Sequence, residues 1–141
     1  MKTTAVLSLV AGICFMAWVP LGAHHSVAGE FDPNKPVTVT GTVTKIEWVN
    51  PHSRVHFDVV NADGNVTNWS VELAARVVLE RMGWNGQSLK VGDTITVKGD
   101  QARSGAPIMN ARGRELEQIR TGGPKEYPIV RADGTAVLFD R

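Results

Sequence analysis

Apolar and polar residues alternate with a period of two in the first half of the chain, which is the pattern of half-buried β-strands. The alternation covers residues 37–43 and then changes phase, because Ile46 sits on the parity opposite to Val43. A β-bulge at residues 44–45 reconciles the two phases and bends the strand, as closure of a barrel requires. We therefore expect one long, bulged strand that ends near residue 50.

Two further alternating runs predict a β-hairpin over residues 54–73. Its loop is Ala-Asp-Gly at residues 62–64, three residues long with the glycine in the left-handed conformation. This register places Phe57 opposite Trp69 on the inner face. A two-residue loop would pair residues of opposite faces, so we exclude it. The predicted outer cross-strand pairs are Arg54 with Glu72, His56 with Ser70, and Asp58 with Asn68.

The rest of the chain predicts one short helix and two more strands. Residues 74–82 carry apolar side chains at helical spacing and are followed by Gly83, a typical residue after a helix end. Residues 94–98 alternate as a strand, and residues 108–116 are expected to form the last one. Glycines and prolines from residue 121 on predict an irregular tail, with a small hairpin around residues 132–134.

The element order of strand, strand, strand, helix, strand, strand is typical of the OB-fold. We therefore expect a mainly β domain over residues 24–120, a five-stranded OB-like small barrel with one short helix between strands three and four. An irregular C-terminal tail over residues 121–141 follows it. A small β-sandwich is the alternative, and the single helix favours the barrel.

The first 23 residues have the layout of a cleaved secretory signal peptide. A positive charge precedes an apolar run over residues 5–19, which is short for a transmembrane span, and small residues follow it. Cleavage after Ala23 makes His24 the first residue of the mature chain, whereas cleavage after Ala28 removes both His24 and His25. We favour Ala23, and we expect a periplasmic protein with no membrane attachment after cleavage.

The composition and the net charge exclude several classes of function. The 141 residues are 43% hydrophobic, with 15 Lys+Arg against 14 Asp+Glu and a formal net charge of +1. This balance is ordinary for a globular protein and argues against a nucleic-acid partner. The single cysteine, Cys14, lies in the expected signal peptide, which excludes a disulfide framework and a cysteine-based zinc site. The serines lack a glycine-rich elbow or oxyanion motif, so we expect no enzyme.

Several short motifs together resemble a known family. They are Ala23-His24-His25-Ser26, Glu30-Phe31-Asp32, Gly41-Thr42-Val43, Glu47-Trp48-Val49-Asn50-Pro51-His52, Asn68-Trp69, Gly83-Trp84, Leu89-Lys90-Val91-Gly92-Asp93 and Asn110-Ala111-Arg112. Over residues 23–120 the chain resembles a family of small exported bacterial proteins known as a domain of unknown function, DUF6152. The resemblance implies a bacterial, periplasmic protein and implies no activity, so the chemistry has to be inferred from the residues.

The four histidines fall in two places, the expected mature N-terminus and the region after the first strand. As an N-terminal residue, His24 can chelate one metal through its free amine and its ring Nδ1, and a second imidazole completes a three-nitrogen set. Such a set suits Cu(II), which has the highest affinity among the divalent first-row metals, and it resembles the histidine brace of some copper proteins. His52 is the best candidate for the second ring because Pro51 rigidifies its loop. His25 and His56 are further candidate ligands.

Two hypotheses follow, and both are non-enzymatic. In the first, the chain is an exported small metal-binding protein, a periplasmic carrier or buffer with copper as its cofactor. In the second, it is a binding or interaction module for an unknown protein or small-molecule partner, using Arg54, Asp58 and Glu72 on the outer face of strands two and three. That face lacks an aromatic stacking platform, which again argues against nucleic acid. Purely structural roles for His52 and His56 stay open.

Overall fold

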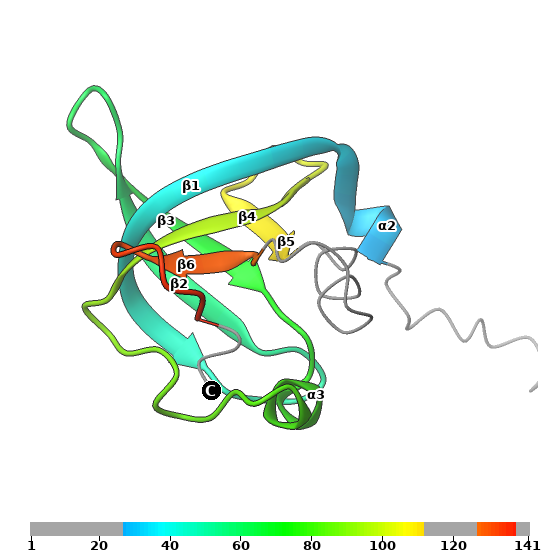
Figure 1. The fold of residues 1–141 in the computed structure, drawn as a ribbon. Helices are drawn as coiled ribbons and strands as arrows, with labels where there is room; N and C mark the ends of the chain where they lie inside the picture. The colour runs from blue at the N-terminus through cyan, green and yellow to red at the C-terminus, as the bar shows by residue number, and fades with distance from the viewer. Residues whose placement is uncertain (1–26, 112–126, 138–141) are drawn as a thin grey trace, which may run out of the picture.

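The computed structural model of the protein describes residues 27–111 and 127–137, and this part of the chain is mainly β (Figure 1). Within it, one mixed sheet contains the strands β1 (Phe31–Glu47), β2 (Arg54–Val60), β3 (Val66–Glu72), β4 (Thr94–Ala102), β5 (Ile108–Ala111) and β6 (Ile129–Arg131). Two short helices accompany the sheet in the same residues, α2 (Val27–Glu30) before β1 and α3 (Arg76–Arg81) between β3 and β4. Neither helix is long and apolar enough to cross a membrane.

Strand β1 is 17 residues long and has two neighbours. Residues 36–42 pair antiparallel with β4, and residues 42–47 pair antiparallel with β2. The sheet order is β1-β2-β3-β5-β4-β6, with β1 and β4 as an additional pair. Strands β3 and β5 run parallel, whereas the other described pairs are antiparallel.

The predicted bulge in β1 is confirmed, because the register between β1 and β2 shifts between Val43 and Lys45. Gly41 lies just before this bulge, where β1 passes from one neighbour to the other. A Cβ atom at Gly41 would lie 2.4 Å from the backbone oxygen of Asp58. Glycine therefore permits the close approach of β1 and β2 at the bend.

The predicted register of the β2–β3 hairpin is also confirmed. Phe57 pairs with Trp69, and every other predicted cross-strand pair is formed. The Asn61 N–H donates to the Asn65 carbonyl at 2.8 Å, which closes a three-residue loop with Gly64 at φ 82°. Phe57 is fully buried, whereas Trp69 is half-buried and packs against the edge of the core.

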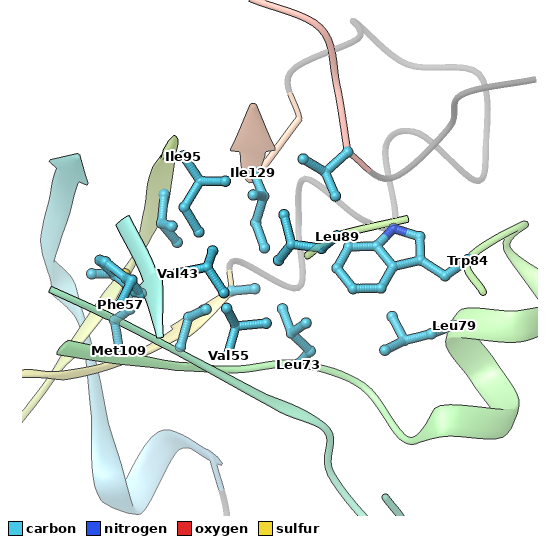
Figure 2. Packing of buried hydrophobic residues seen from close by; sticks show 14 residues of the cluster. Val43, Val55, Phe57, Leu73, Leu79, Trp84, Leu89, Ile95, Met109 and Ile129 are labelled. Carbon is cyan, nitrogen blue, oxygen red and sulfur yellow. The ribbon is translucent and has the colours of Figure 1, made fainter. Parts of the chain in front are cut away.

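The core is built from the inward positions of the strands and from helix α3 (Figure 2). Leu79 is the buried residue of α3, which is shorter than predicted and leaves Val78 40% exposed. Trp84 follows the helix, is buried, and stacks on Trp48 with ring centroids 5.7 Å apart. The strands contribute buried residues that include Val43, Val55, Phe57, Val71, Ile95, Val97, Met109 and Ile129.

The segment predicted as an irregular tail contributes a strand. Residues 129–131 pair antiparallel with β4, Ile129 is fully buried, and the predicted hairpin forms with a bond from the Arg131 N–H to the Thr135 carbonyl. The described residues thus contain six strands instead of five, because three residues are too few to give a period-two signal. The expected signal peptide and residues 112–116, which were predicted to belong to the last strand, lie outside the described residues.

Candidate functional site

The loop that carries His52 is fastened to the end of β3. The backbone N–H of Ser53 donates to the Ala74 carbonyl at 3.1 Å, and the Ser53 carbonyl accepts from the Leu73 N–H at 2.9 Å. The buried Ser53 hydroxyl donates to the Val49 carbonyl at 3.2 Å. These bonds continue the β2–β3 pairing beyond the strand ends, so His52 is placed beside the last residues of β3.

Glu72 at the end of β3 binds both His52 and Arg54. Nδ1 of His52 lies 2.7 Å from Oε1 of Glu72, and Nη2 of Arg54 donates to Oε2 at 2.9 Å. The Glu72 side chain is only 8% exposed, and the His52 side chain is 48% exposed. Two charge-assisted donors offset the cost of burying a carboxylate. Nδ1 is thus the ring nitrogen of His52 that faces the carboxylate, and Nε2 is the ring nitrogen that does not.

An open pocket of about 340 Å³ lies beside this pair. Its lining includes His52 and Glu72 from the β1–β2 loop and β3, and Asn110 from β5. Val27, the first residue of α2, lines the same pocket. Val27 and His52 therefore line one pocket, and Val27 follows His24 by three residues in the sequence.

Helix α2 is held in place by Arg103, which follows β4. The guanidinium Nε donates to the Ala28 carbonyl at 3.1 Å, and Nη1 lies 3.7 Å from Oδ2 of Asp32. The Arg103 backbone N–H donates to the Glu30 carbonyl at 2.9 Å. Sequence reasoning missed these contacts because a lone arginine in a loop and a four-residue helix carry no periodic signal.

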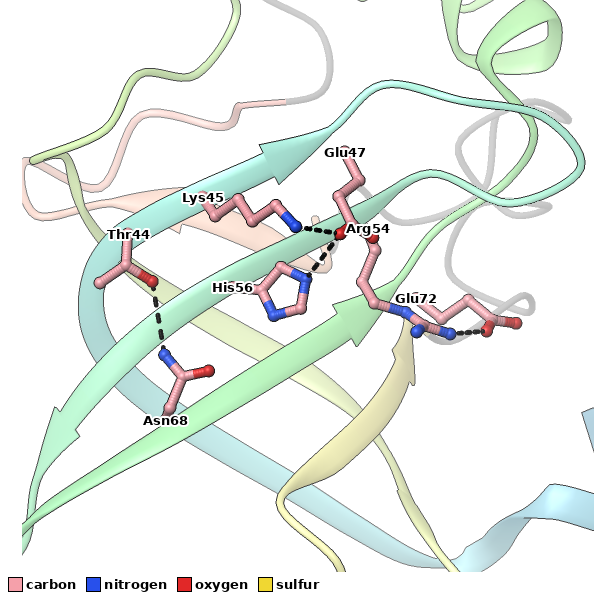
Figure 3. A network of polar contacts seen from close by, with 7 residues as sticks. All are labelled: Thr44, Lys45, Glu47, Arg54, His56, Asn68 and Glu72. Atoms are coloured by element: carbon pink, nitrogen blue, oxygen red, sulfur yellow. Dashed lines mark hydrogen bonds and ion pairs between the residues drawn. The ribbon is translucent and has the colours of Figure 1, made fainter.

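The second described histidine belongs to a separate cluster (Figure 3). Nε2 of His56 is buried and lies 3.6 Å from Oε1 of Glu47, which is too long for a hydrogen bond. Lys45 donates to the same oxygen. This hydrogen bond is the main cause that lowers the pKa of Glu47 below its ordinary value; desolvation opposes it, and the charges of Lys45 and His56 lower the pKa further. The ring of His56 is turned toward β1, whereas Arg54 is turned toward Glu72.

The three residues expected to bind a ligand form two separate pairs. Arg54 binds Glu72, and Asp58 accepts a 2.7 Å hydrogen bond from Nδ2 of Asn68. Glu72, expected on the outer face of strands two and three, is buried, because β5 pairs alongside β3 up to Glu72 and His52 covers the carboxylate. Arg54, with its side chain 38% exposed, is the more accessible partner.

The metal ligands predicted at the N-terminus, His24 and His25, lie outside the described residues. Within residues 27–111 and 127–137, no group of three His, Cys, Asp or Glu side chains could hold a metal ion. The described part of the chain brings His52 together with Glu72 and does not bring His52 and His56 into such a group. One signal could have placed His52, because a register that pairs Arg54 with Glu72 puts residue 52 beside the end of β3.

Comparison with known proteins identifies a family. A family model described as "Family of unknown function (DUF6152)" matches residues 13–110. No curated protein and no solved structure matches the chain. The matched segment contains all four histidines and both of the carboxylates that face the described ones. The chain belongs to the DUF6152 family.

Proposed function

We propose that the protein is an exported, non-enzymatic carrier or buffer that holds one Cu(II) ion between its N-terminal His24 and His52. The observation that carries this proposal is the shared pocket wall of Val27 and His52. Three residues span at most about 11 Å. The proposal places the amine and ring of His24 within this span of Val27, at a metal bound to Nε2 of His52.

The second support is the carboxylate behind His52. Histidines that bind metals commonly donate their other ring N–H to a carboxylate, which fixes the ring orientation and raises its basicity. Glu72 makes this contact at 2.7 Å, and Arg54 holds the other carboxylate oxygen. With the amine and Nδ1 of His24, His52 completes three nitrogen ligands, a set that suits Cu(II). His25 can add its ring or amide nitrogen beside the free amine, whereas the contact of His56 with Glu47 lends a ligand role for His56 no support.

The proposal requires signal cleavage after Ala23 and export to the periplasm. Residues 27–30 form α2, and the Ala28 carbonyl accepts a hydrogen bond from Arg103. Cleavage after Ala28 would divide this helix and remove both N-terminal histidines. Cleavage after Ala23 leaves α2 whole, which supports His24 as the first residue.

We further propose that the sheet closes as an OB-like barrel with α3 as its helix between strands three and four. Because β1 pairs with both β2 and β4, the pairings β1-β2-β3-β5-β4-β1 form a ring. The bulge after Val43 and the glycine at position 41 supply the bend that closure needs. In this view β6 is an addition on β4, outside the ring.

Copper titration of the protein that begins at His24 tests the proposed function. We expect one Cu(II) per chain at neutral pH, an axial, nitrogen-rich electron paramagnetic resonance signal, and weaker binding on acidification because protons compete for the ligands. Adding one glycine before His24 removes the amine from the chelate and should weaken binding. Equal affinity of the extended protein would contradict the chelate.

Two substitutions test the second ligand. His52→Ala should lower the Cu(II) affinity at least tenfold. It should lower the melting temperature by only a few degrees, because His52 lies half-exposed in a loop but is one of the two partners of the buried Glu72 carboxylate. His56→Ala is the matched control and should bind copper like the wild type. If His52→Ala leaves copper binding unchanged, or if the exported protein has an intact mass that begins at Gly29, the proposal is wrong.

A further inference from the structure

We propose that the pocket beside the stacked rings of Trp48 and Trp84 is a second binding site, one that takes a single small, uncharged aromatic molecule with a carbonyl oxygen. This pocket has a volume of about 230 Å³. Its described lining consists of Ile46, Trp48, Trp84, Asn85, Gly86 and Leu89, none of which lines the pocket beside His52. The inference therefore stands apart from the copper site.

The wall of this pocket is apolar and aromatic. Trp84 and Leu89 are buried, Ile46 and Trp48 are half-buried, and the described lining contains no charged side chain. The two indole rings are parallel to within 8°, with centroids 5.7 Å apart. Aromatic rings attract further rings in offset or edge-on arrangements. Pockets for drug-sized ligands measure roughly 300–1,000 Å³, so the smaller volume found here suits a molecule with one ring.

Trp84 supplies a hydrogen-bond donor that the described part of the chain leaves unused. The residue is 3% exposed, and its Nε1 is shielded from solvent and has no partner among these residues. Buried polar groups in native proteins nearly always have a partner, because an unmade bond to a buried donor is costly. Figure 2 shows the nitrogen on the ring edge that faces away from Leu79, which is not part of the described lining. An acceptor on a molecule seated against the ring therefore completes this hydrogen bond.

The acceptor that fits this position is a neutral oxygen. Burial of a carboxylate takes a charge out of water, and one indole N–H is too little to offset that cost in an apolar pocket. A carbonyl oxygen loses much less hydration and accepts from the same donor. Because the indole nitrogen only donates, a ligand group without an acceptor gains no hydrogen bond from it.

The mouth of the pocket is shaped by a turn that bonds to itself. The Asn85 N–H donates to Oγ of Ser88 at 2.9 Å, and the Gln87 N–H donates to Oδ1 of Asn85 at 2.8 Å. Gly86 lies within this turn, and a Cβ atom there would meet nothing beyond its chain neighbours within 4 Å. A larger side chain at position 86 therefore has room to occupy the mouth without disturbing the wall.

Three ligands of similar size test the inference in the exported protein. Acetophenone has the ring and the carbonyl, ethylbenzene has a methylene in place of the carbonyl, and benzoate carries a charge. Nitrogen–proton NMR of the indole N–H groups follows each titration. We expect acetophenone to shift the Trp84 resonance downfield with one-site saturation, and to bind about tenfold more tightly than the other two. Equal binding of ethylbenzene or benzoate, or an unmoved Trp84 resonance, would contradict the inference.

Two substitutions locate the ligand. Trp84→Phe keeps an aromatic ring and removes the donor, so acetophenone should bind about tenfold more weakly and no better than ethylbenzene. Gly86→Leu should weaken the binding of both by blocking the mouth. Trp69→Phe is the matched control and should bind acetophenone like the wild type, because Trp69 is half-buried on β3 and is not part of the described lining.

The remaining outcomes decide whether the ligand sits in this pocket. Acetophenone binding that survives Gly86→Leu, or that is lost equally in Trp69→Phe, would place the ligand elsewhere and overturn the inference. Should Trp84→Phe fail to fold, the three ligands in the wild type and in Gly86→Leu decide alone. All these titrations are made without copper, so their result is independent of the copper titration.

Discussion

The two histidines that the structure describes lie four residues apart and differ in the ring nitrogen that faces a carboxylate. His52 lies in a loop, gives Nδ1 to the buried carboxylate of Glu72, and exposes about half of its side chain. His56 lies on a strand, is 24% exposed, and has its Nε2 buried opposite Glu47. Both rings therefore have a nearby carboxylate, and the copper proposal distinguishes them by which ring nitrogen faces it. The pairing must use one ring nitrogen and leave the other accessible.

The two carboxylates that face these histidines, Glu72 and Glu47, differ in their burial and in their partners. Glu72 is buried and bound by two donors, so its removal takes a shared acceptor from His52 and Arg54. Glu47 is at the surface and shared by Lys45 and His56, where solvent screens the interaction. Equivalent substitutions at the two positions should have different consequences for stability and for copper binding.

The largest expected effect is on stability, through the buried side chains of the β2–β3 hairpin. Phe57→Ala should lower the free energy of unfolding by about 3–5 kcal/mol, because the side chain is fully buried between strands. Trp69→Ala should cost less, because Trp69 is half-buried. Denaturant unfolding of both variants measures the difference, and an equal cost would mean that the two rings are buried alike.

The register of the β2–β3 hairpin could be predicted from the sequence, whereas the different contacts of His52 and His56 could not. Strict alternation on both sides of the Ala-Asp-Gly loop at residues 62–64 allowed one register, and the structure has it. The bond from His52 to Glu72 depends on the shape of a loop that has no period. The pattern placed Glu72 on an outer face, but β5 covers that end of β3 through a parallel pairing between strands distant in the sequence.

Short elements were missed for a related reason. Helix α2 has four residues and β6 has three, which is about one period of a helix and less than two of a strand. Their positions are set by tertiary contacts, Arg103 for α2 and pairing with β4 for β6. Sequence patterns report burial repeated along the chain, so single contacts of this kind leave no trace in them.

The second prediction contrasts the two carboxylates directly. Glu72→Gln should cost about 1–3 kcal/mol, because the hydrogen bond from Arg54 and the contact with His52 both lose a buried charged acceptor. It should also lower Cu(II) affinity about tenfold, since the ring of His52 loses its carboxylate. Glu47→Gln, the matched control, should leave copper binding unchanged. Thermal unfolding and copper titration of both proteins provide the measurements, and equal copper affinities would remove the distinction between the two sites.

A smaller effect is expected at Arg54, which supports Glu72 from the opposite strand. Arg54→Ala should cost about 1 kcal/mol, because Arg54 is partly exposed but the buried carboxylate of Glu72 loses one of its two partners. Copper binding should remain, because the bond between His52 and Glu72 is independent of Arg54. A loss of copper affinity as large as that of Glu72→Gln would mean that Arg54 is required to orient the carboxylate.

The smallest effect is on the titration of Glu47. Its pKa lies below the ordinary value of 4.5, chiefly because Lys45 donates a hydrogen bond to it, so this carboxylate adds stability above its unfolded-state pKa and loses it as pH falls through the folded-state pKa. Lys45→Met should raise the pKa of Glu47 toward the ordinary value and flatten this acid-side dependence. Copper binding at neutral pH should not change, because the cluster of His56 is separate from that of His52. Side-chain carboxyl NMR as a function of pH measures the pKa, and a value unaffected by Lys45→Met would show that His56 is the main charge on Glu47.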